Sequence, residues 1–205
     1  EPRTWKVFLN GEELSGGAAA LEVLEAAAGT LSLNLTLTLP EDGGDFDEYR
    51  CDLELRLAGP EGGLTLREEA VFPRIRAPEF TITSIAVMKA ELINTRFRVD
   101  LRIDNPNIFP VALSSLSYEL YGNGRFWARG REWNILEIPP KGQAAARLFL
   151  EMNFTNMRRE LLDEVIALGT VPYRFTGEAL VDTGLSLLTS FRMTFDRQGL
   201  SAVIE

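Results

Sequence analysis

Four side chains near the middle of the chain have types suited to binding a partner: Trp127, Arg129, Arg131 and Trp133. They alternate with other residues, so an extended strand would place all four on one face. Indole rings stack on ligands, and guanidinium groups bind anions. We therefore predict a candidate binding patch for a sugar or an anionic partner. The alternative is packing in the core or at its rim, because an internal repeat aligns Trp127 with the apolar Leu14.

The residues needed for common catalytic and metal sites are missing from the sequence. The 205 residues include no histidine, which excludes Ser–His–Asp and Cys–His nucleophilic arrangements. A single cysteine cannot build a thiolate metal site. No glycine-rich loop followed by Lys-Ser or Lys-Thr is present to hold a phosphate. We predict no catalytic residue, no metal ligand set and no cofactor, and therefore a non-enzymatic protein.

Two further features each have two interpretations. Five acidic residues in one segment either hold calcium or form a solvated turn, and their spacing differs from that of a calcium-binding helix–loop–helix; they are Glu41, Asp42, Asp45, Asp47 and Glu48. The single cysteine, Cys51, lies in the strand-like run 49–57, where it is either a small buried side chain or a reactive thiol. An unrecognised hydrolase that uses paired carboxylates would require a cleft with two facing acids.

Composition and charge limit the partners that the chain can have. Apolar residues make up 45% of the sequence, enough for a folded core. With 21 basic and 30 acidic residues the net charge is −9, so the basic surface of a nucleic-acid-binding protein is not expected. No segment is apolar enough to cross a membrane. The remaining expectation is a protein partner or a partner in the cell envelope.

The sequence contains an internal repeat. Asn123-Gly124 follows Asn10-Gly11 at an offset of 113 residues, and Gly142 follows Gly29 at the same offset. Asn-Gly is a strong signal for a two-residue hairpin, because both residues tolerate positive φ. Alternating apolar strands follow in both copies, at 31–39 and at 144–152.

The second copy is longer than the first. Tyr173-Arg174 aligns with Tyr49-Arg50 at an offset of 124, which is 11 more than 113. We interpret the extra residues as one helix near 155–168. The second copy begins near Glu79, so the first copy lacks its opening strands. The predicted domains are a partial repeat, 1–77, and a complete one, 78–205, and the open edge of the first repeat predicts self-association.

A charged strand and a proline-containing turn lie in the second copy. In residues 96–104 apolar side chains alternate with charged ones of both signs, which is typical of a strand with one solvated face. The strand must end at Asn105-Pro106-Asn107, because proline removes a backbone donor. Phe109, followed by Pro110, offers an apolar anchor for this turn. We predict a structural role for Asn105, Pro106, Asn107, Phe109 and Pro110.

This order of elements resembles the water-stress and hypersensitive-response (WHy) domain of the group 2 late-embryogenesis-abundant proteins. After the Asn-Pro-Asn turn the pattern continues with the strand 116–120, the run Trp127-Ala128-Arg129-Gly130, and Ile138-Pro139-Pro140-Lys141-Gly142. The resemblance covers 79–205, and residues 1–77 join it through the internal repeat. It implies two immunoglobulin- or fibronectin-III-like β-sandwich repeats, the second with the inserted helix, and neither enzymatic activity nor a cofactor.

Two functions are consistent with these observations. The resemblance implies a non-enzymatic protein of desiccation or other stress that contacts or stabilises other macromolecules. The alternative is a cell-envelope interaction module: a lipoprotein-type scaffold, an adhesive domain or a carbohydrate-binding β-sandwich. A location facing the periplasm is expected if an export signal or lipid anchor precedes Glu1, and a cytoplasmic location otherwise.

Overall fold

The computed structural model describes residues 2–14, 19–27, 30–39, 46–57, 63–90, 94–153 and 170–204. Every regular element in these ranges is a β-strand, so the prediction of an all-β protein is confirmed. The helix expected near residues 155–168 lies outside the described residues. Within the described ranges, no helix is long and apolar enough to cross a membrane. The chain divides into two compact units, Glu1–Ile75 (unit 1) and Arg76–Glu205 (unit 2).

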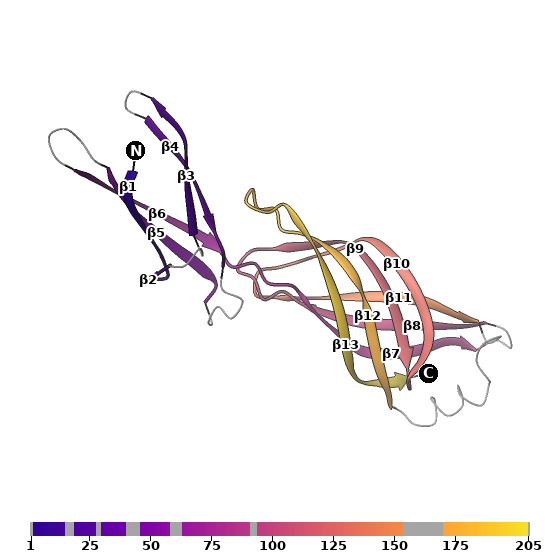
Figure 1. The fold of residues 1–205 in the computed structure, drawn as a ribbon. Coiled ribbons are helices and arrows are strands. Elements are labelled where there is room, and N and C mark those ends of the chain that lie inside the picture. The colour runs from indigo at the N-terminus through magenta and orange to yellow at the C-terminus, as the bar shows by residue number, and fades with distance from the viewer. Residues whose placement is uncertain are drawn as a thin grey trace. The chain divides into compact units, whose positions relative to one another are not determined.

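Unit 1 contains two antiparallel sheets (Figure 1). The larger has the order β2-β1-β5-β6, with β1 (Pro2–Leu9), β2 (Glu12–Glu13), β5 (Glu48–Leu57) and β6 (Leu64–Pro73). The smaller pairs β3 (Ala19–Ala27) with β4 (Thr30–Leu37). Leu35 and Leu37 of β4 pack against the buried cluster of the larger sheet, which consists of Val7, Leu9, Tyr49 and Cys51. Apolar packing therefore joins the two layers.

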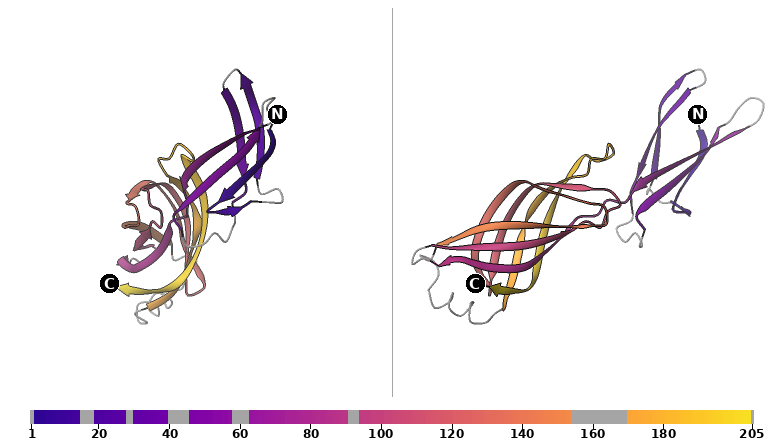
Figure 2. Two further views of the ribbon diagram at one scale, coloured as in Figure 1. Left: turned by 90° about the vertical axis from the view of Figure 1, so that its left-hand side faces the viewer. Right: turned by 180° about the vertical axis from the view of Figure 1, so that it is seen from behind.

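Unit 2 is one seven-stranded sheet with the order β10-β9-β12-β13-β7-β8-β11. Its strands are β7 (Glu79–Ala90), β8 (Asn94–Asp104), β9 (Val111–Gly122), β10 (Arg125–Ile138), β11 (Gln143–Asn153), β12 (Thr170–Asp182) and β13 (Ser190–Ile204). All neighbours are antiparallel except β13 and β7, which are parallel. The sheet curls around a common interior, nearly as a barrel (Figures 1 and 2). The immunoglobulin-like arrangement of two separate sheets is not confirmed, because these strands form one continuous ladder.

Strand β8 shows why these sequences form strands that line a core. Phe97, Val99, Leu101 and Ile103 are each at most 2% exposed. Each such side chain contributes about 1.5–3 kcal/mol through burial. The charged residues between them lie on the outer face, where Arg98 is 3.2 Å from Asp100 and Arg102 is 3.0 Å from Asp104. The alternation read from the sequence is thus the alternation between interior and solvent.

The two hairpin turns predicted at the Asn-Gly pairs are present. Asn10 and Gly11 have φ of 51° and 86°, and Asn123 and Gly124 have φ of 49° and 73°. The strands around them follow the same order, because β2-β1-β5-β6 corresponds to β10-β9-β12-β13. The offset of 113 therefore relates equivalent positions at these turns.

The second offset needs a correction. The N–H of Asn10 donates to the carbonyl of Arg50, and the N–H of Asn123 donates to the carbonyl of Pro172, each at 2.8 Å. The equivalent residues are thus Arg50 and Pro172, and 172 − 50 gives an offset of 122, where the sequence had suggested 124. A slip of two residues leaves every side chain on the same face of a strand. An alignment that matches the pattern of apolar and polar residues is the same at either offset, so it could not reveal the error.

Unit 1 has no counterpart of β7 and β8 among its described residues. In unit 2, β8 pairs with β11. In unit 1 the equivalent strand β4 pairs with β3. Leu35 and Leu37 of β4 are half-buried, whereas their counterparts Leu148 and Leu150 of β11 are 1% and 4% exposed. The core of unit 1 is therefore less completely covered than that of unit 2.

Candidate functional site

The Asn-Pro-Asn turn is a buried structural network. Asn105 is 2% exposed, and its Nδ2 donates to the carbonyls of Phe109 at 2.8 Å and Pro139 at 3.0 Å. Its Oδ1 accepts from the backbone N and from Nδ2 of Asn107, at 3.0 and 2.8 Å. Asn107, 1% exposed, exchanges two hydrogen bonds with the backbone of Arg76: its Oδ1 accepts at 2.7 Å and its Nδ2 donates at 2.8 Å.

These bonds fasten three separate segments at one end of unit 2. The backbone adds two more, since the N–H of Asn105 donates to the carbonyl of Gly142 and that of Lys141 donates to the carbonyl of Asn107, each at 2.8 Å. Phe109 is 7% exposed, whereas Pro106 is half-buried and Pro110 is exposed. The geometry is that of a structural clamp that buries its polar atoms in pairs.

Trp127 does not share a face with the other three residues of the predicted patch. It is 5% exposed and stacks on Phe97, with ring centroids 5.6 Å apart. The pairing of β10 with β9 shifts register between Phe126 and Ala128, which is a β-bulge at Trp127. A bulge puts two consecutive side chains on the same side of a sheet, so counting by twos fails across it. Gly122 leaves the room that the indole needs, because a Cβ there would overlap its ring.

The other three residues do lie on the outer face of β10. Arg129 and Arg131 are exposed, and Trp133 is 66% exposed. The Arg131 guanidinium lies 5.6 Å from the centre of the Trp133 ring, and the Arg129 guanidinium lies 5.9 Å from that of Phe126. Each arginine thus covers an exposed aromatic ring. We call Phe126, Arg129, Arg131 and Trp133 the β10 outer patch.

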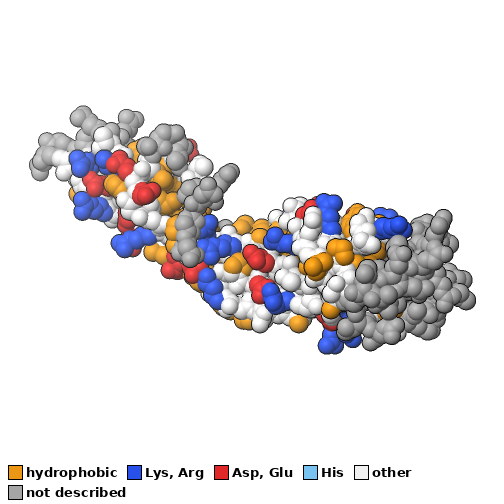
Figure 3. All heavy atoms as spheres, turned by 90° about the horizontal axis from the view of Figure 1, so that it is seen from below, with side chains coloured by type: hydrophobic (Ala, Val, Ile, Leu, Met, Phe, Trp, Pro, Cys, Tyr) orange, Lys and Arg blue, Asp and Glu red, His pale blue; other side chains and the backbone are white. Residues whose placement is uncertain are grey.

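Opposite charges surround the β10 outer patch. Arg129 and Arg131 line a shallow depression of about 640 Å³ together with Glu119 and Glu178. The Nε of Arg131 also donates to the hydroxyl of Ser117 at 2.8 Å. On the face shown in Figure 3, basic and acidic side chains are likewise interspersed. The depression is therefore balanced in charge, which does not favour a strongly anionic ligand.

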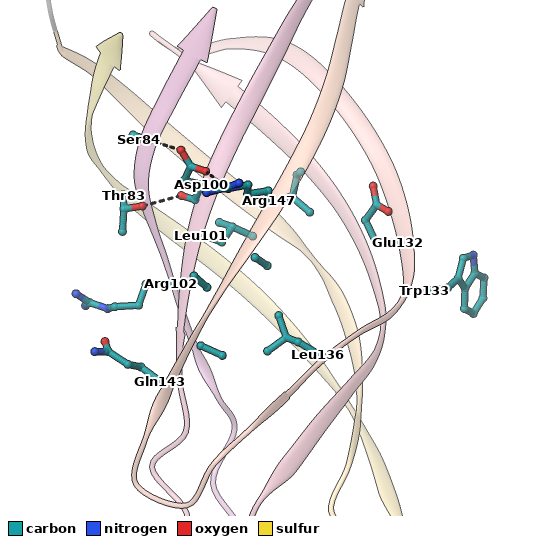
Figure 4. Close-up of a pocket in the computed structure, with 14 residues that line it drawn as sticks. Thr83, Ser84, Asp100, Leu101, Arg102, Glu132, Trp133, Leu136, Gln143 and Arg147 are labelled. Carbon is teal, nitrogen blue, oxygen red and sulfur yellow. Dashed lines mark hydrogen bonds and ion pairs between the residues drawn. The ribbon is translucent and has the colours of Figure 1, made fainter. Parts of the chain in front are cut away.

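A larger groove lies where the two ends of the curled sheet face each other. It has a volume of about 1090 Å³ and is lined by residues 143–148 of β11, by Glu132, Trp133 and Leu136 of β10, and also by Thr83, Ser84, Asp100, Leu101 and Arg102 of β7 and β8. Figure 4 shows Leu136 pointing into the space between the strands and Trp133 pointing away from it. The sequence patterns described above do not reveal this groove. The run Ala144-Ala145-Ala146 could have indicated the groove, because small side chains leave space above and below a strand.

Asp100, which lines this groove, has three side-chain partners among the described residues. It accepts from the Ser84 hydroxyl at 2.6 Å and lies 3.2 Å from Arg98 and 3.4 Å from Arg147. The Ser84 hydrogen bond, followed by the arginines, lowers the pKa of Asp100 against the opposing effect of burial. A carboxylate held ionised by fixed partners is typical of an ion-pair network on the outer face of a sheet.

The remaining sequence candidates are placed only in part. Cys51 is 4% exposed, and burial, followed by the charge of Asp52, raises the pKa of its thiol. That environment favours the interpretation of a small buried side chain over that of a reactive thiol. Of the acidic segment, residues 41–45 lie outside the described residues. No group of three or more potential metal-ligating side chains occurs in the part of the chain that the structure describes.

Comparison with known proteins gives one sequence family and several solved structures. Residues 100–199 match the family model of the late embryogenesis abundant protein LEA_2. None of the curated proteins compared with the chain matches it.

Three solved structures resemble the chain at low identity. A solution structure from Arabidopsis thaliana shares 14% identity with a TM-score of 0.50, covering 65% of this chain and 86% of that one. A crystal structure of an Archaeoglobus fulgidus protein shares 16% identity, with a TM-score of 0.36 and coverage of 62% and 95%. A candidate late embryogenesis abundant protein shares 13% identity, with a TM-score of 0.43 and coverage of 63% and 73%. Of the three, the Arabidopsis thaliana structure shows a shared fold.

Proposed function

Unit 2 belongs to the late embryogenesis abundant type 2 family, and from this premise we propose that the chain is a non-enzymatic stress protein that stabilises other macromolecules during drying. The observation that carries the proposal is the match over residues 100–199, which extends from the middle of β8 to β13. A family relation supports a class of function by analogy, and residues of the site must supply the mechanism.

Two features of the surface support action by contact with other macromolecules. The β10 outer patch presents Trp133 at 66% exposure and Phe126 at 46%, so aromatic surface is available for packing. Arginine and aromatic side chains are enriched among residues that dominate protein interfaces. The strand beneath is held by its pairing with β9, which includes Arg129, Arg131 and Trp133. A paired strand that carries aromatic and cationic side chains on its outer face can contact a partly unfolded protein through them.

A drying assay tests the proposal. A labile enzyme is dried and rehydrated with the full chain, and separately with an equal mass of an unrelated β-sandwich protein of similar net charge. We expect enzyme activity to survive with this chain and to be largely lost with the control. Equal protection by both proteins would mean generic crowding or surface coverage and would refute the proposal.

Surface variants identify the part of the chain that makes the contact. The double variant Arg131→Ala with Trp133→Ala removes the centre of the β10 outer patch, and Arg192→Ala with Leu200→Ala removes exposed residues of β13 as a matched control. We expect the first double variant to lose most of the protection and the second to keep it. If protection persists in both variants, the contact lies elsewhere.

A second candidate is an interaction module of the cell envelope that binds a carbohydrate or protein partner through the same patch. The observation that favours it is the pairing of Arg131 with the exposed Trp133 ring, 5.6 Å from guanidinium to centroid, because an exposed indole offers a flat face for stacking. A glycan array screened with the chain and with Trp133→Ala tests this. Binding that disappears in the variant supports the module, and no binding to any glycan on the array removes its carbohydrate form.

A further inference from the structure

The curled sheet of unit 2 ends in two strand edges that face each other without pairing. Strands β10 and β11 occupy the two ends of the order β10-β9-β12-β13-β7-β8-β11, and no backbone ladder joins them among the described residues. An unpaired strand edge presents a row of N–H and C=O groups that another strand can satisfy. Here two such rows border the same groove.

The path of the chain makes this groove a wedge. Strands β10 and β11 are consecutive and are joined by a tight turn, in which the N–H of Gly142 donates to the carbonyl of Pro139 at 3.1 Å. From this turn they diverge, because β11 pairs with β8 along Gln143–Asn153 while β10 follows β9. Figure 4 shows the two strands separating above the turn, with Leu136 between them and Thr83, Arg102 and Gln143 on the far side of β11.

Unit 1 shows what the equivalent strands do when β8 has no counterpart. There β3 and β4 pair directly, from Ala27 with Thr30 to Ala19 with Leu37. The facing edges of this pair of strands are therefore able to form a backbone ladder in this fold. In unit 2 the pairing of β11 with β8 holds these edges apart and leaves the groove of about 1090 Å³.

We propose that unit 2 binds an extended segment of another polypeptide as an eighth strand between β10 and β11. Because those two strands are antiparallel to each other, the inserted strand is parallel to one and antiparallel to the other, a mixture that the parallel pair β13–β7 already introduces into this sheet. Insertion pairs both open edges at once along the lined stretch and there closes the sheet into a barrel. This inference stands independently of protection during drying.

The lining residues indicate which peptide fits. Ala144, Ala145 and Ala146 have small side chains, which leave room above and below the sheet for larger side chains of an inserted strand. On the β10 side, Leu136 points into the groove and favours an apolar residue (Figure 4). The groove is also lined by Asp100, Arg102, Glu132 and Arg147. Arg147 lies 3.4 Å from Asp100 and Arg102 lies 3.0 Å from Asp104, whereas Glu132 forms no ion pair among the described residues. A segment with a basic residue two positions from apolar ones, alternating with small polar residues, therefore complements the groove. The lined stretch 143–148 accommodates about six residues, or roughly 20 Å of strand.

The probe is the fluorescein-labelled peptide Thr-Lys-Thr-Val-Thr-Val, with blocked termini, titrated into the full chain and followed by fluorescence anisotropy. We expect saturable binding with a Kd on the order of 10–100 µM. Two further peptides carry N-methyl groups on the first, third and fifth residues, or on the second, fourth and sixth. Successive residues of a strand direct their N–H groups to opposite edges, so each modified peptide loses its donors toward one neighbouring strand only.

The two methylated peptides distinguish insertion from simple edge addition. Insertion requires both edges of the peptide, so both modified peptides should bind at least tenfold more weakly. If only one is weakened, the peptide adds to a single edge, and the proposal is wrong. Equal binding of all three peptides, or no saturable binding of the unmodified one, overturns it as well.

A protein variant locates the site. Glu132→Gln should weaken binding of the lysine peptide by about threefold to fivefold but leave binding of a peptide with threonine in place of lysine unchanged. Glu137→Gln alters an exposed residue of the same strand that does not line the groove, and it should leave both affinities unchanged. Amide hydrogen exchange gives an independent measurement: peptide should slow exchange at alternate residues of β10 and β11. Slowing confined to unit 1 would refute the location.

Discussion

Replacing Asn105 by alanine should destabilise unit 2 strongly, because one side chain closes the whole Asn-Pro-Asn turn. Its two donor hydrogens point to the carbonyls of Phe109 and Pro139, with that of Ile138 also within 3.3 Å. Its oxygen accepts two further bonds from Asn107. Alanine removes these four hydrogen bonds, so the backbone and Asn107 groups that form them lose a partner in a buried site.

The expected loss can be estimated from these contacts. Each hydrogen bond contributes about 1 kcal/mol net, and orphaned buried groups add to the cost while local relaxation reduces it. The four bonds therefore predict a loss of about 3–4 kcal/mol in the free energy of unfolding. Asn105→Asp has nearly the same shape but replaces the donating amide with an acceptor that faces carbonyl oxygens. At neutral pH it should be at least as destabilising as alanine.

Urea unfolding followed by tryptophan fluorescence measures this change. In a Trp5→Phe background the remaining tryptophans, Trp127 and Trp133, both report on unit 2. Gln143→Ala is the matched control, because it removes an exposed amide beside the same turn and should change stability by less than about 0.5 kcal/mol. A loss below about 1 kcal/mol for Asn105→Ala, or equal losses for the variant and its control, would refute the clamp interpretation.

Three further predictions follow from the structure. Trp127→Ala should cost about 3–5 kcal/mol in urea unfolding, since it empties the site stacked on Phe97; a loss below about 1 kcal/mol would contradict its burial. The lowered pKa of Asp100 contributes stability above the pKa of the unfolded chain, and this is lost as the pH falls through the lower folded value, below about 4. Ser84→Ala should raise the Asp100 pKa in a carbon-13 NMR titration and so reduce that pH dependence, and an unchanged pKa would mean that the hydroxyl is not its main cause. We also propose that the edge of β6, where Val71 is 55% exposed, pairs with a second copy, so sedimentation should show dimers that Val71→Lys weakens; a monomer at every concentration would exclude this.

Local sequence patterns were enough to predict the strands, the hairpin turns and the family. The alternation of apolar and charged residues predicted β8, because side chains of a strand alternate between its two faces and burial of the apolar face is favourable. The two Asn-Gly pairs marked both hairpins, since few other residue pairs adopt positive φ at consecutive positions. The structural role predicted for the Asn105–Pro110 segment also had a local reason, because a proline lacks the backbone N–H that a central strand would donate.

Tertiary structure decided which side chains meet. Trp127 is not part of the predicted patch, because a bulge in the pairing with β9 directs its side chain inward. A bulge depends on the partner strand, so the sequence of β10 alone does not show it. The two-residue error in the repeat offset has the same origin, since register is set between strands while the facing of side chains is unchanged. The groove between β10 and β11 exists only because β11 pairs with β8, a contact between residues about 50 apart in the sequence, whereas in unit 1 the equivalent strands close on each other. Sequence by itself determined what each segment can form, and the competition between strand partners determined which edges and which aromatic rings remain open.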